Sequence, residues 1–504
     1  MATAINLFKP FHIDDAYHLK AAQWILEDPF RPMSGVINWS GHLEHFHQGN
    51  QPPFFFYCMA IWGKCFGFSE VSMHLLLSLF TGLSILYFHG AARILAPGNA
   101  LFLTALLVVG PAFLVNQNVM LDIPMLAMIC AILFHLVRFI QTPRTKDLVC
   151  AAIWLSIGIL TKYTVLALVP VVLLVIWLGG RSVIWIASIP LLTVFLWSIW
   201  NWFEFEGIHL FGRELEPPSG DRLHIRIVSW LMTLGAIMPW FWITVLVRRQ
   251  QFIWPILGSI VAFMFVVWLG LIDQAFSDRV LPILFSIIGA AVIIVLFFTT
   301  KKFFELDDVY RKMLLLLILS IASLATFTIL FAPWMATRHL LLVLPMFLLH
   351  FAPVLRLMQP SVRLATLGLT AILGILLAIS DIRFALFYQD SASVISRKYE
   401  ADRVWFLGSL GWGWYAEQAG MRDLAVTTQM PIPGDLIAIP LDFSSGIVPT
   451  GIAISEVVMI VQDLGPFDRL STRTWLRFYS ARFPDTPWNI TQGQPERILL
   501  QKVQ

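Results

Sequence analysis

The chain has 504 residues, of which 58% are hydrophobic and only 13% are charged. Soluble globular proteins are about half apolar and about a quarter charged, so this composition excludes an ordinary soluble protein and predicts a multi-pass membrane protein. The formal net charge is only +3, and we expect no nucleic-acid partner.

The cysteines and the first residues exclude two further classes. Cys58, Cys65, Cys130 and Cys150 form no CxxC pair, which argues against a metal–thiolate site and against a disulfide framework. Residues 1–20 lack an apolar core, so we predict no cleavable signal peptide.

The first polar feature is the stretch "PFHIDDAYHLK" at residues 10–20, which places Asp14 and Asp15 side by side. One interpretation is structural, because Asp caps helix N-termini and acids in the first turn suit the helix dipole. The other is functional. Successive helical residues point about 100° apart, so one acid can cap while its neighbour faces a site.

The stretch "HFHQGNQPPFFFY" follows. His45 and His47 lie with His42 in a polar loop, where they are either solvated or metal ligands. The proline pair favours the start of a helix. Because the apolar stretch at 53–67 is too short for a span and contains Lys64, we predict a helix lying in the membrane interface.

Long apolar stretches dominate residues 71–384, which we predict to be a transmembrane helical domain. A span needs about 20 mainly apolar residues. On this basis we predict about twelve spans, near residues 71–92, 99–117, 121–141, 147–162, 164–180, 183–203, 227–247, 252–272, 280–300, 313–333, 339–357 and 362–383.

Charge placement predicts the sidedness of these spans. Short basic turns alternate with longer, acid-bearing segments, and cytoplasmic loops carry the excess of Lys and Arg. We assign these turns to the cytoplasm; they contain Arg93, Arg138, Arg144, Lys146, Arg181, Arg248, Arg249, Lys301, Lys302, Arg311, Lys312, Arg356 and Arg363. Residues 1–70, with their interfacial helices and acidic motif, then form the first extracytoplasmic loop. Since nothing anchors this loop, we expect an apolar stretch of about 20 codons upstream of Met1.

Residues 385–504 have an ordinary composition and are predicted to form a small extracytoplasmic α/β domain. Within it, "RVWFLG" and "EVVMIVQDL" are typical of buried strands, and "GWYAEQAG" of a short helix. The stretch "GSLGWG" lacks the spacing of a dinucleotide-binding loop, so we interpret it as a turn.

Ionisable residues mark the predicted outer ends of several spans. Asp122 lies in "NVMLDIPML", Lys162 in "GILTKYTVLALVP", and Arg338 and His339 in "ATRHLLLVLP". Asp122 has helix capping as its structural alternative, and Lys162 has snorkelling. Outer positive charges run against the sidedness rule, so each calls for an anionic partner. Together with the acids, these cations indicate a lipid-phosphate substrate with an outward head group.

The order of these motifs resembles that of the GT-C glycosyltransferases over about residues 10–360. The most similar branch contains the protein O-mannosyltransferases and the bacterial aminoarabinose transferase of lipid A. The resemblance rests on an acidic pair in the first outer loop, a Pro-Pro helix, "MLDIPM", "GILTKYT" and "ATRHLLLVLP". It implies a multi-pass helical fold, in the cell (inner) membrane, with its active site on the extracytoplasmic face.

The resemblance also implies roles for individual residues. Asp14 or Asp15 would act on the acceptor, with Asp14 favoured, while Lys162 and Arg338 would bind the donor phosphate. The remaining candidates are expected to support the site: Asp122, His47, Gln51 and His339.

The implied reaction is an inverting hexosyl or pentosyl transfer. The donor is a polyprenyl-phosphate sugar, and the acceptor is a lipid, a glycan or a protein. A carboxylate that takes the proton of a hydroxyl typically helps by ~10²–10⁴-fold, and cations stabilise the leaving phosphate. No cofactor is required by this chemistry; a divalent metal ion at Asp14, Asp15 and His47 is the alternative that the residues leave open.

Two other functional classes fit a polytopic chain. A transporter places ionisable groups near the bilayer midplane, on broken helices within internal repeats. In this sequence the polar candidates gather at one predicted surface, and no repeat is visible. A lipid-binding scaffold without catalysis is the second alternative.

Overall fold

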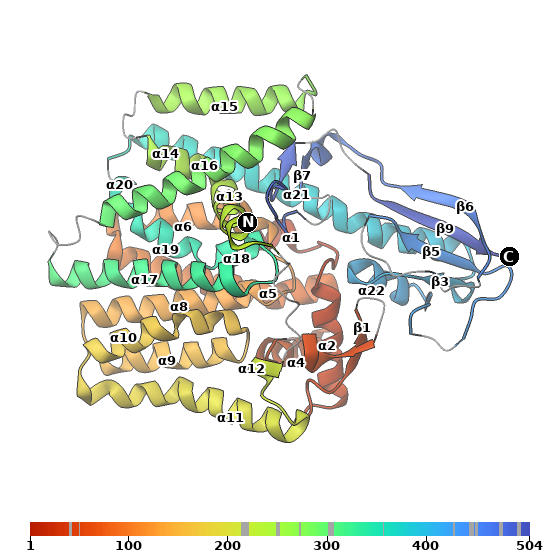
Figure 1. The fold of residues 1–504 in the computed structure, drawn as a ribbon, viewed down its shortest axis with the longest axis horizontal. Coiled ribbons are helices and arrows are strands. Elements are labelled where there is room, and N and C mark those ends of the chain that lie inside the picture. The colour runs from red at the N-terminus through yellow and green to blue at the C-terminus, as the bar shows by residue number, and fades with distance from the viewer. Residues whose placement is uncertain are drawn as a thin grey trace.

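The computed structural model consists of a helical body and a smaller α/β tail that projects from one end of it (Figure 1). It describes residues 1–39, 43–49, 51–212, 221–247, 252–271, 274–300, 307–355, 357–426, 429–442, 448, 452–472, 477–490 and 495–504. His42 and the basic residues Arg248, Arg249, Lys301, Lys302 and Arg356 lie outside the described residues.

The chain begins with short elements that lie between the helical body and the tail. They are α1 Ala2–Asn6, α2 Asp15–Glu27, β1 Val36–Asn38, β2 Leu43–His45, α3 Phe46–Gly49 and α4 Phe54–Phe66. β1 and β2 pair antiparallel. The helix predicted at 53–67 is present as α4, which packs against α2.

The helical body is built from the elements between Glu70 and Lys398. They are α5 Glu70–Leu95, η1 Pro97–Asn99, α6 Ala100–Val109, α7 Pro111–Val115, α8 Asp122–Gln141, α9 Thr145–Ile159, η2 Tyr163–Leu168, α10 Val169–Leu178, η3 Arg181–Ala187, α11 Ser188–Phe205, α12 His209–Gly212, α13 Leu223–Ile237, α14 Pro239–Leu246, α15 Ile253–Trp268, α16 Gln274–Thr300, α17 Asp308–Phe331, α18 Thr337–Leu341, α19 Leu344–His350, α20 Ala352–Leu355 and α21 Pro360–Lys398.

The structure does not confirm the predicted count of about twelve spans. Among the described residues, six helices are long and apolar enough to cross a membrane, and the pair α13–α14, bent by 92°, would make a seventh. Several predicted spans are short or broken instead. Pro111 and Pro239 each begin a new helix at such a break, since proline cannot continue the preceding one. A helix of 15 residues such as α9 extends only about 22 Å, less than the roughly 30 Å hydrocarbon core.

The core of the body is centred on α8, which is buried along most of its length and packs against α5 and α9. At the periphery, α11 leaves large apolar side chains exposed, with Phe203 at 84% and Trp202 at 59%. An apolar surface of this kind suits lipid and not water, in agreement with a multi-pass membrane protein.

Helix α21 joins the body to the tail. It has 39 residues and is therefore about 58 Å long, well beyond the thickness of a hydrocarbon core. The predicted boundary at 384/385 falls inside this helix, which ends at Lys398. Hydropathy drops towards the end of this helix because polar residues collect from Gln389 onward, but the backbone stays helical to Lys398.

The described part of the tail contains a five-stranded mixed sheet, a separate pair of strands, the helix α22 and two short 3₁₀ helices. The strand order is β4-β3-β5-β9-β6, with β3 parallel to β4 and β5 and the remaining pairs antiparallel. The "RVWFLG" stretch provides the buried strand β3 Val404–Phe406, and "EVVMIVQDL" provides β6 Ile454–Val461. The prediction that the second strand is buried is wrong, because β6 is an edge strand whose side chains are exposed or half-buried. The predicted helix is α22 Leu410–Gln418. The other strands are β4 Arg422–Asp423, β5 Leu436–Pro440 and β9 Arg497–Val503, with β7 Leu470–Ser471 and β8 Asn489–Ile490 forming a separate pair.

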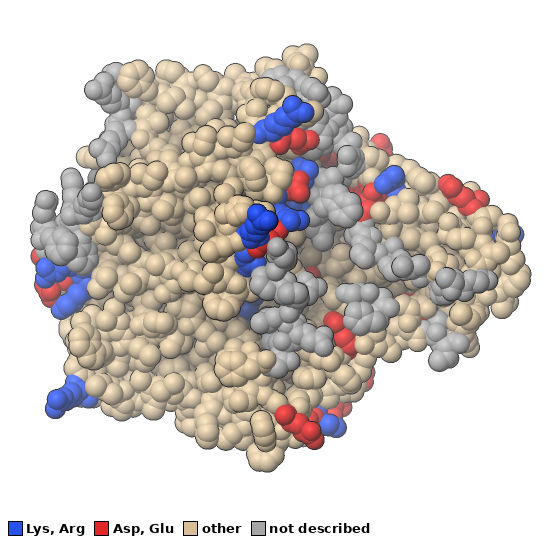
Figure 2. Space-filling view, viewed as in Figure 1, with Lys and Arg blue, Asp and Glu red and all other residues tan. Residues whose placement is uncertain are grey.

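Charged side chains are sparse over the body. Figure 2 shows them gathered at the end opposite the tail and again in a band beside the tail, with a broad uncharged surface between. This is the distribution expected of a protein whose middle section lies in lipid.

Candidate active site at the junction of body and tail

The acidic pair lies where the chain enters α2. Asp14 occupies the N-cap position of α2, but its side chain makes no capping hydrogen bond. The Oδ2 atom of Asp15 accepts a hydrogen bond of 3.0 Å from the backbone N–H of His12, upstream of the helix. Neither carboxylate therefore has the simple capping role that the sequence allowed.

Asp14 belongs to a row of alternating charges that we name the charge ladder: Asp14, Arg338, Asp122 and Lys162. Arg338 Nη1 lies 3.1 Å from Asp14 Oδ2, and Arg338 Nε lies 3.7 Å from Asp122 Oδ2. Lys162 Nζ donates to Asp122 Oδ1 at 2.6 Å. Four residues predicted from separate motifs are thus in direct contact.

Three helix beginnings and one short helix contribute the residues of the charge ladder. Asp14 precedes α2, Asp122 is the first residue of α8, and Lys162 directly precedes η2. Arg338 lies in the short helix α18. Arg338 and Asp122 are buried, whereas the side chain of Asp14 is 29% exposed. The ladder is therefore accessible from the Asp14 end.

Two of the predicted supporting residues lie beside the ladder. Gln51 Oε1 accepts a hydrogen bond of 3.4 Å from the backbone N–H of Tyr163, the neighbour of Lys162. The Phe54 N–H donates to Leu160 O at 2.9 Å, so the Pro-Pro turn docks against the "GILTKYT" turn. The charged neighbours of His339 are Lys162, Arg338 and Asp122.

His47 does not join the acids. Its ring stacks on that of Phe205, with centroids 4.3 Å apart and planes 1° from parallel. Over the described part of the chain, no three His, Cys, Asp or Glu side chains are grouped to hold a metal ion. The considered set of Asp14, Asp15 and His47 is not assembled, because Asp14 faces Arg338 while Asp15 faces His12.

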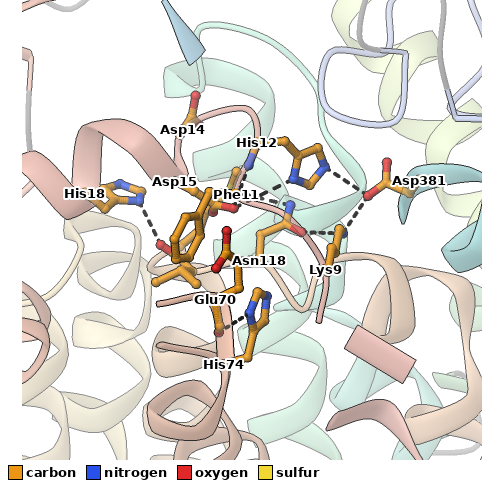
Figure 3. Close-up of polar contacts among 12 residues, drawn as sticks. Lys9, Phe11, His12, Asp14, Asp15, His18, Glu70, His74, Asn118 and Asp381 are labelled. Carbon is orange, nitrogen blue, oxygen red and sulfur yellow. Dashed lines mark hydrogen bonds and ion pairs between the residues drawn. The ribbon is translucent and has the colours of Figure 1, made fainter. Parts of the chain in front are cut away.

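Asp15 borders a second cluster that the sequence analysis missed, the buried network of Lys9, His12, Asn118, Asp381 and Tyr479. Figure 3 shows Lys9, His12, Asn118 and Asp381 of this network. The carboxylate of Asp381 is its centre. Asp381 Oδ2 lies 2.6 Å from Lys9 Nζ, 3.0 Å from His12 Nε2 and 2.8 Å from the Tyr479 hydroxyl, which donates to it.

The other contacts close this network. Lys9 Nζ donates to Asn118 Oδ1 at 2.6 Å, and Asn118 Nδ2 donates to the Tyr479 hydroxyl at 2.9 Å. Burial, together with the neighbouring Asp381 carboxylate, raises the pKa of Tyr479 well above its usual value, so this phenol stays neutral. One signal in the sequence pointed to the network: Asp381 is an acid within an apolar stretch, and such residues need a partner.

Charge balance explains how the buried network is stable. Lys9 is 1% exposed and Asp381 is fully buried. With Asp15, which is also buried, the cluster holds two carboxylates and one lysine, and a protonated His12 would make it neutral. Burial and Lys9 lower the pKa of His12, but the Asp381 and Asp15 carboxylates outweigh them, so this pKa lies above 6.5.

The chain is similar to known proteins in sequence and in fold. Residues 50–200 match the sequence family described as dolichyl-phosphate-mannose-protein mannosyltransferase. The crystal structure of ArnT from Cupriavidus metallidurans bound to undecaprenyl phosphate is similar over 99% of this chain and 95% of that one, with a TM-score of 0.52 and 12% identity. The apo structure of the same protein gives a TM-score of 0.40 and 14% identity over 87% of this chain and 90% of that one. No protein of curated function matches the sequence.

Proposed function

We propose that this chain, a membrane protein with the fold of the GT-C glycosyltransferases, transfers a sugar from a polyprenyl-phosphate donor to a hydroxyl group of a lipid, glycan or protein acceptor. The observation that carries the proposal is the charge ladder, which ends in the partly exposed Asp14. The bound lipid named for the ArnT structure, undecaprenyl phosphate, supports a donor of this class.

Arg338 and Lys162 are the proposed ligands of the donor phosphate. The ladder holds two cations and two carboxylates, so it is neutral before any substrate binds. Within the described part of the chain, Arg338 Nε and His339 Nδ1 are buried and make no hydrogen bond. Such unsatisfied buried atoms favour a ligand that supplies their partners. A phosphate oxygen suits the guanidinium in particular.

Binding of the donor would also make Asp14 a stronger base. A phosphodiester carries one negative charge and competes with Asp14 for Arg338. Once displaced, the Asp14 carboxylate faces an added anion and becomes a better proton acceptor. The acceptor hydroxyl then attacks the anomeric carbon, so that the new C–O bond forms as the bond to the phosphate oxygen breaks.

The products balance in atoms and charge. The hydroxyl proton moves to Asp14, and the electron pair of the broken bond stays on the polyprenyl phosphate. Arg338 and Lys162 stabilise this more negative phosphate. Attack from the side opposite the leaving group inverts the anomeric carbon. Asp15, which is buried beside His12, would hold the loop and not touch the substrate.

The proposed location is the cell membrane, with the site and the tail on the extracytoplasmic face. The support is the set of basic turns, which the sidedness rule assigns to the cytoplasm. Arg93, Arg138 and Lys146 lie at or next to helix ends of this kind. A polyprenyl-phosphate sugar presented at the outer leaflet would reach the Asp14 end of the ladder.

The test is transfer of labelled sugar from polyprenyl-phosphate donors by the purified protein in proteoliposomes. Asp14→Asn should lower transfer by at least ~10²-fold, because the proton acceptor is lost. The matched control is Glu27→Gln, an exposed acid on the same helix, which should leave transfer unchanged. Full activity of Asp14→Asn would contradict the assigned base.

A binding assay distinguishes the proposed role of Arg338 in holding the phosphate from that of Asp14 as the base. Arg338→Met should weaken binding of labelled polyprenyl phosphate, since a phosphate left without its charged partner in a low-dielectric site costs several kcal/mol. Asp14→Asn should keep or strengthen that binding, because it removes the competing carboxylate. Equal loss in both variants would show that Asp14 is not the competitor.

A further inference from the structure

The loop that carries the acidic pair, residues 9–15, is held from two sides by side chains of the C-terminal region. We infer that Tyr479 and Tyr415 are positioning residues of the active site, and that the tail is a working part of that site. The inference rests on the proposed function for its catalytic meaning, while the contacts themselves are independent of it.

Tyr479 provides the first hold. Its hydroxyl donates to Asp381 Oδ2 at 2.8 Å, accepts from Asn118 Nδ2 at 2.9 Å and lies 3.1 Å from His12 Nε2. Only a group that both donates and accepts hydrogen bonds, such as a hydroxyl, can make these contacts at the same time. His12 in turn contacts Asp15 through its backbone N–H. The tail thus reaches the acidic pair through one buried hydroxyl and one imidazole.

The same segment also fixes the other side of the charge ladder. The Thr337 N–H donates to Phe478 O at 3.2 Å, and the Ala481 N–H donates to Met335 O at 2.7 Å. These bonds flank Tyr479 and lie just before Arg338 in the chain. One tail segment therefore sets the position of both partners in the Asp14–Arg338 contact.

Tyr415 provides the second hold, from α22. Its hydroxyl accepts from the Phe11 N–H at 2.7 Å and donates to Glu70 Oε1 at 2.7 Å. The Phe11 ring packs edge-on against Trp414, with centroids 5.8 Å apart. Figure 3 shows Phe11 and Glu70 beside the buried network.

Gly411 explains the glycine-rich motif "GSLGWG". A Cβ at this position would lie 2.3 Å from Phe11 O and 2.7 Å from His12 Cα. Only glycine lets α22 pack directly on the backbone of residues 11 and 12. The glycine-rich motif therefore forms the surface on which the loop with the acidic pair packs, in addition to the turn that was predicted from its spacing.

The loop needs such support because its backbone is strained. Ile13 has φ of 51°, a left-handed conformation that is unfavourable for a β-branched residue. Strain of this kind persists only where surrounding contacts fix it. Ile13 immediately precedes Asp14, so relaxation of its backbone would redirect the proposed base away from Arg338.

The matched control is Tyr388, another buried tyrosine that links the body to the tail. Its hydroxyl donates to Glu496 Oε2 at 2.6 Å, between α21 and the residue before β9. Tyr388→Phe removes a hydroxyl contact of the same kind, which is made to Glu496 and not to residues 9–15. Tyr479→Phe and Tyr415→Phe test the two holds separately, so one of them remains informative if the other fails to fold.

The first measurement is hydrogen exchange of residues 9–19 in the intact protein in nanodiscs, with thermal melting to check folding. Tyr479→Phe and Tyr415→Phe should speed exchange by about tenfold or more, the effect of losing a hydrogen bond to a buried charged network. Tyr388→Phe should leave it unchanged. Unchanged exchange in both test variants, or equal acceleration in the control, would overturn the inference.

The second measurement is transfer kinetics. Tyr479→Phe should lower kcat by about 10–100-fold with the donor KM unchanged, because a small displacement of a reacting group costs on that order. Tyr388→Phe should keep the wild-type kcat. An unchanged kcat in Tyr479→Phe contradicts the positioning role. If the wild-type protein transfers no sugar from any donor tested, the proposed function fails, while the exchange comparison still decides whether the tail holds the loop.

Discussion

Asp14 and Asp15 are consecutive residues with different surroundings. Asp14 is partly exposed and pairs with Arg338, whereas Asp15 is buried against His12. The separation follows from the helical geometry at the start of α2, where neighbouring side chains point about 100° apart. The two acids therefore lie in different environments, Asp14 at the partly exposed end of the charge ladder and Asp15 beside the buried network.

The titration of His12 predicts how stability depends on pH. The pKa of His12 is raised in the folded protein. The stabilising contribution of protonated His12 to folding is therefore fully present below the pKa of the unfolded chain, about 6.5, and is lost as pH rises through the pKa of the folded protein. The groups that face His12 are Lys9, Asp15, Asp381 and Tyr479. We expect the melting temperature to fall from pH 6.5 upward.

The measurement is thermal melting between pH 6.5 and 9 for the wild type and for His12→Gln. The variant should have the flatter profile, since it lacks the titrating group. Burial lowers the pKa of His18, so His18 acts in the opposite sense and below pH 6.5. Parallel profiles in the two proteins would show that His12 is neutral throughout this range.

At the scale of elements, α13 and α16 approach each other through two glycines. A Cβ on Gly235 would lie 2.0 Å from Phe285 O, and a Cβ on Gly289 would lie 1.9 Å from Leu231 O. These are backbone contacts, which cannot move aside as a flexible side chain does. Close approach of this kind is how membrane helices gain packing, since lipid gives them no hydrophobic drive to associate.

Gly289→Ala should therefore destabilise the body by about 1–3 kcal/mol or more, the usual range for overpacking. The control is Gly82→Ala on α5, where an added Cβ meets nothing within 4 Å and alanine should improve helix propensity by up to about 1 kcal/mol. Thermal melting in the same detergent compares the two. Equal stability of both variants would mean that α13 and α16 separate at little cost.

The long helix α21 is the element that joins the proposed site to the tail. It carries Asp381 in the buried network and Tyr388 in contact with Glu496. A single rigid helix through both regions limits how far the tail can move relative to the charge ladder. The tail is thus fixed to the body by α21 and by both tyrosine contacts to the loop.

At the scale of the molecule, the proposed site lies at the junction of body and tail, and the proposed sidedness can be tested there. Single cysteines are placed in a background without the natural Cys58, Cys65, Cys130 and Cys150. Glu456→Cys, in the exposed edge strand β6, should react with a membrane-impermeant maleimide in intact cells. Lys146→Cys, in the first turn of α9, should react only after permeabilisation, because basic segments at the ends of spans stay in the cytoplasm. The reverse labelling pattern would invert the topology.

The sequence by itself determined the membrane character, the positions of the helices and the residues of the charge ladder. Composition and hydropathy depend only on residues that are neighbours in the sequence, so they can be evaluated without knowledge of the fold. Asp14, Asp122, Lys162 and Arg338 each stand out because a charged residue beside an apolar span needs a partner. The resemblance to GT-C glycosyltransferases supplied their order, and the overall fold agrees with it.

Only the tertiary structure decided which of these residues touch, where the spans break and what the tail does. The buried network joins Lys9, Asn118, Asp381 and Tyr479 across 470 positions of the chain, from 9 to 479. No local pattern encodes such pairs, because the position of Asp381 in an apolar stretch indicates that it needs a partner but not which residue that partner is. The role of Gly411 could not be predicted from the sequence for the same reason. The backbone that packs against it, at Phe11, lies 400 residues away in the chain.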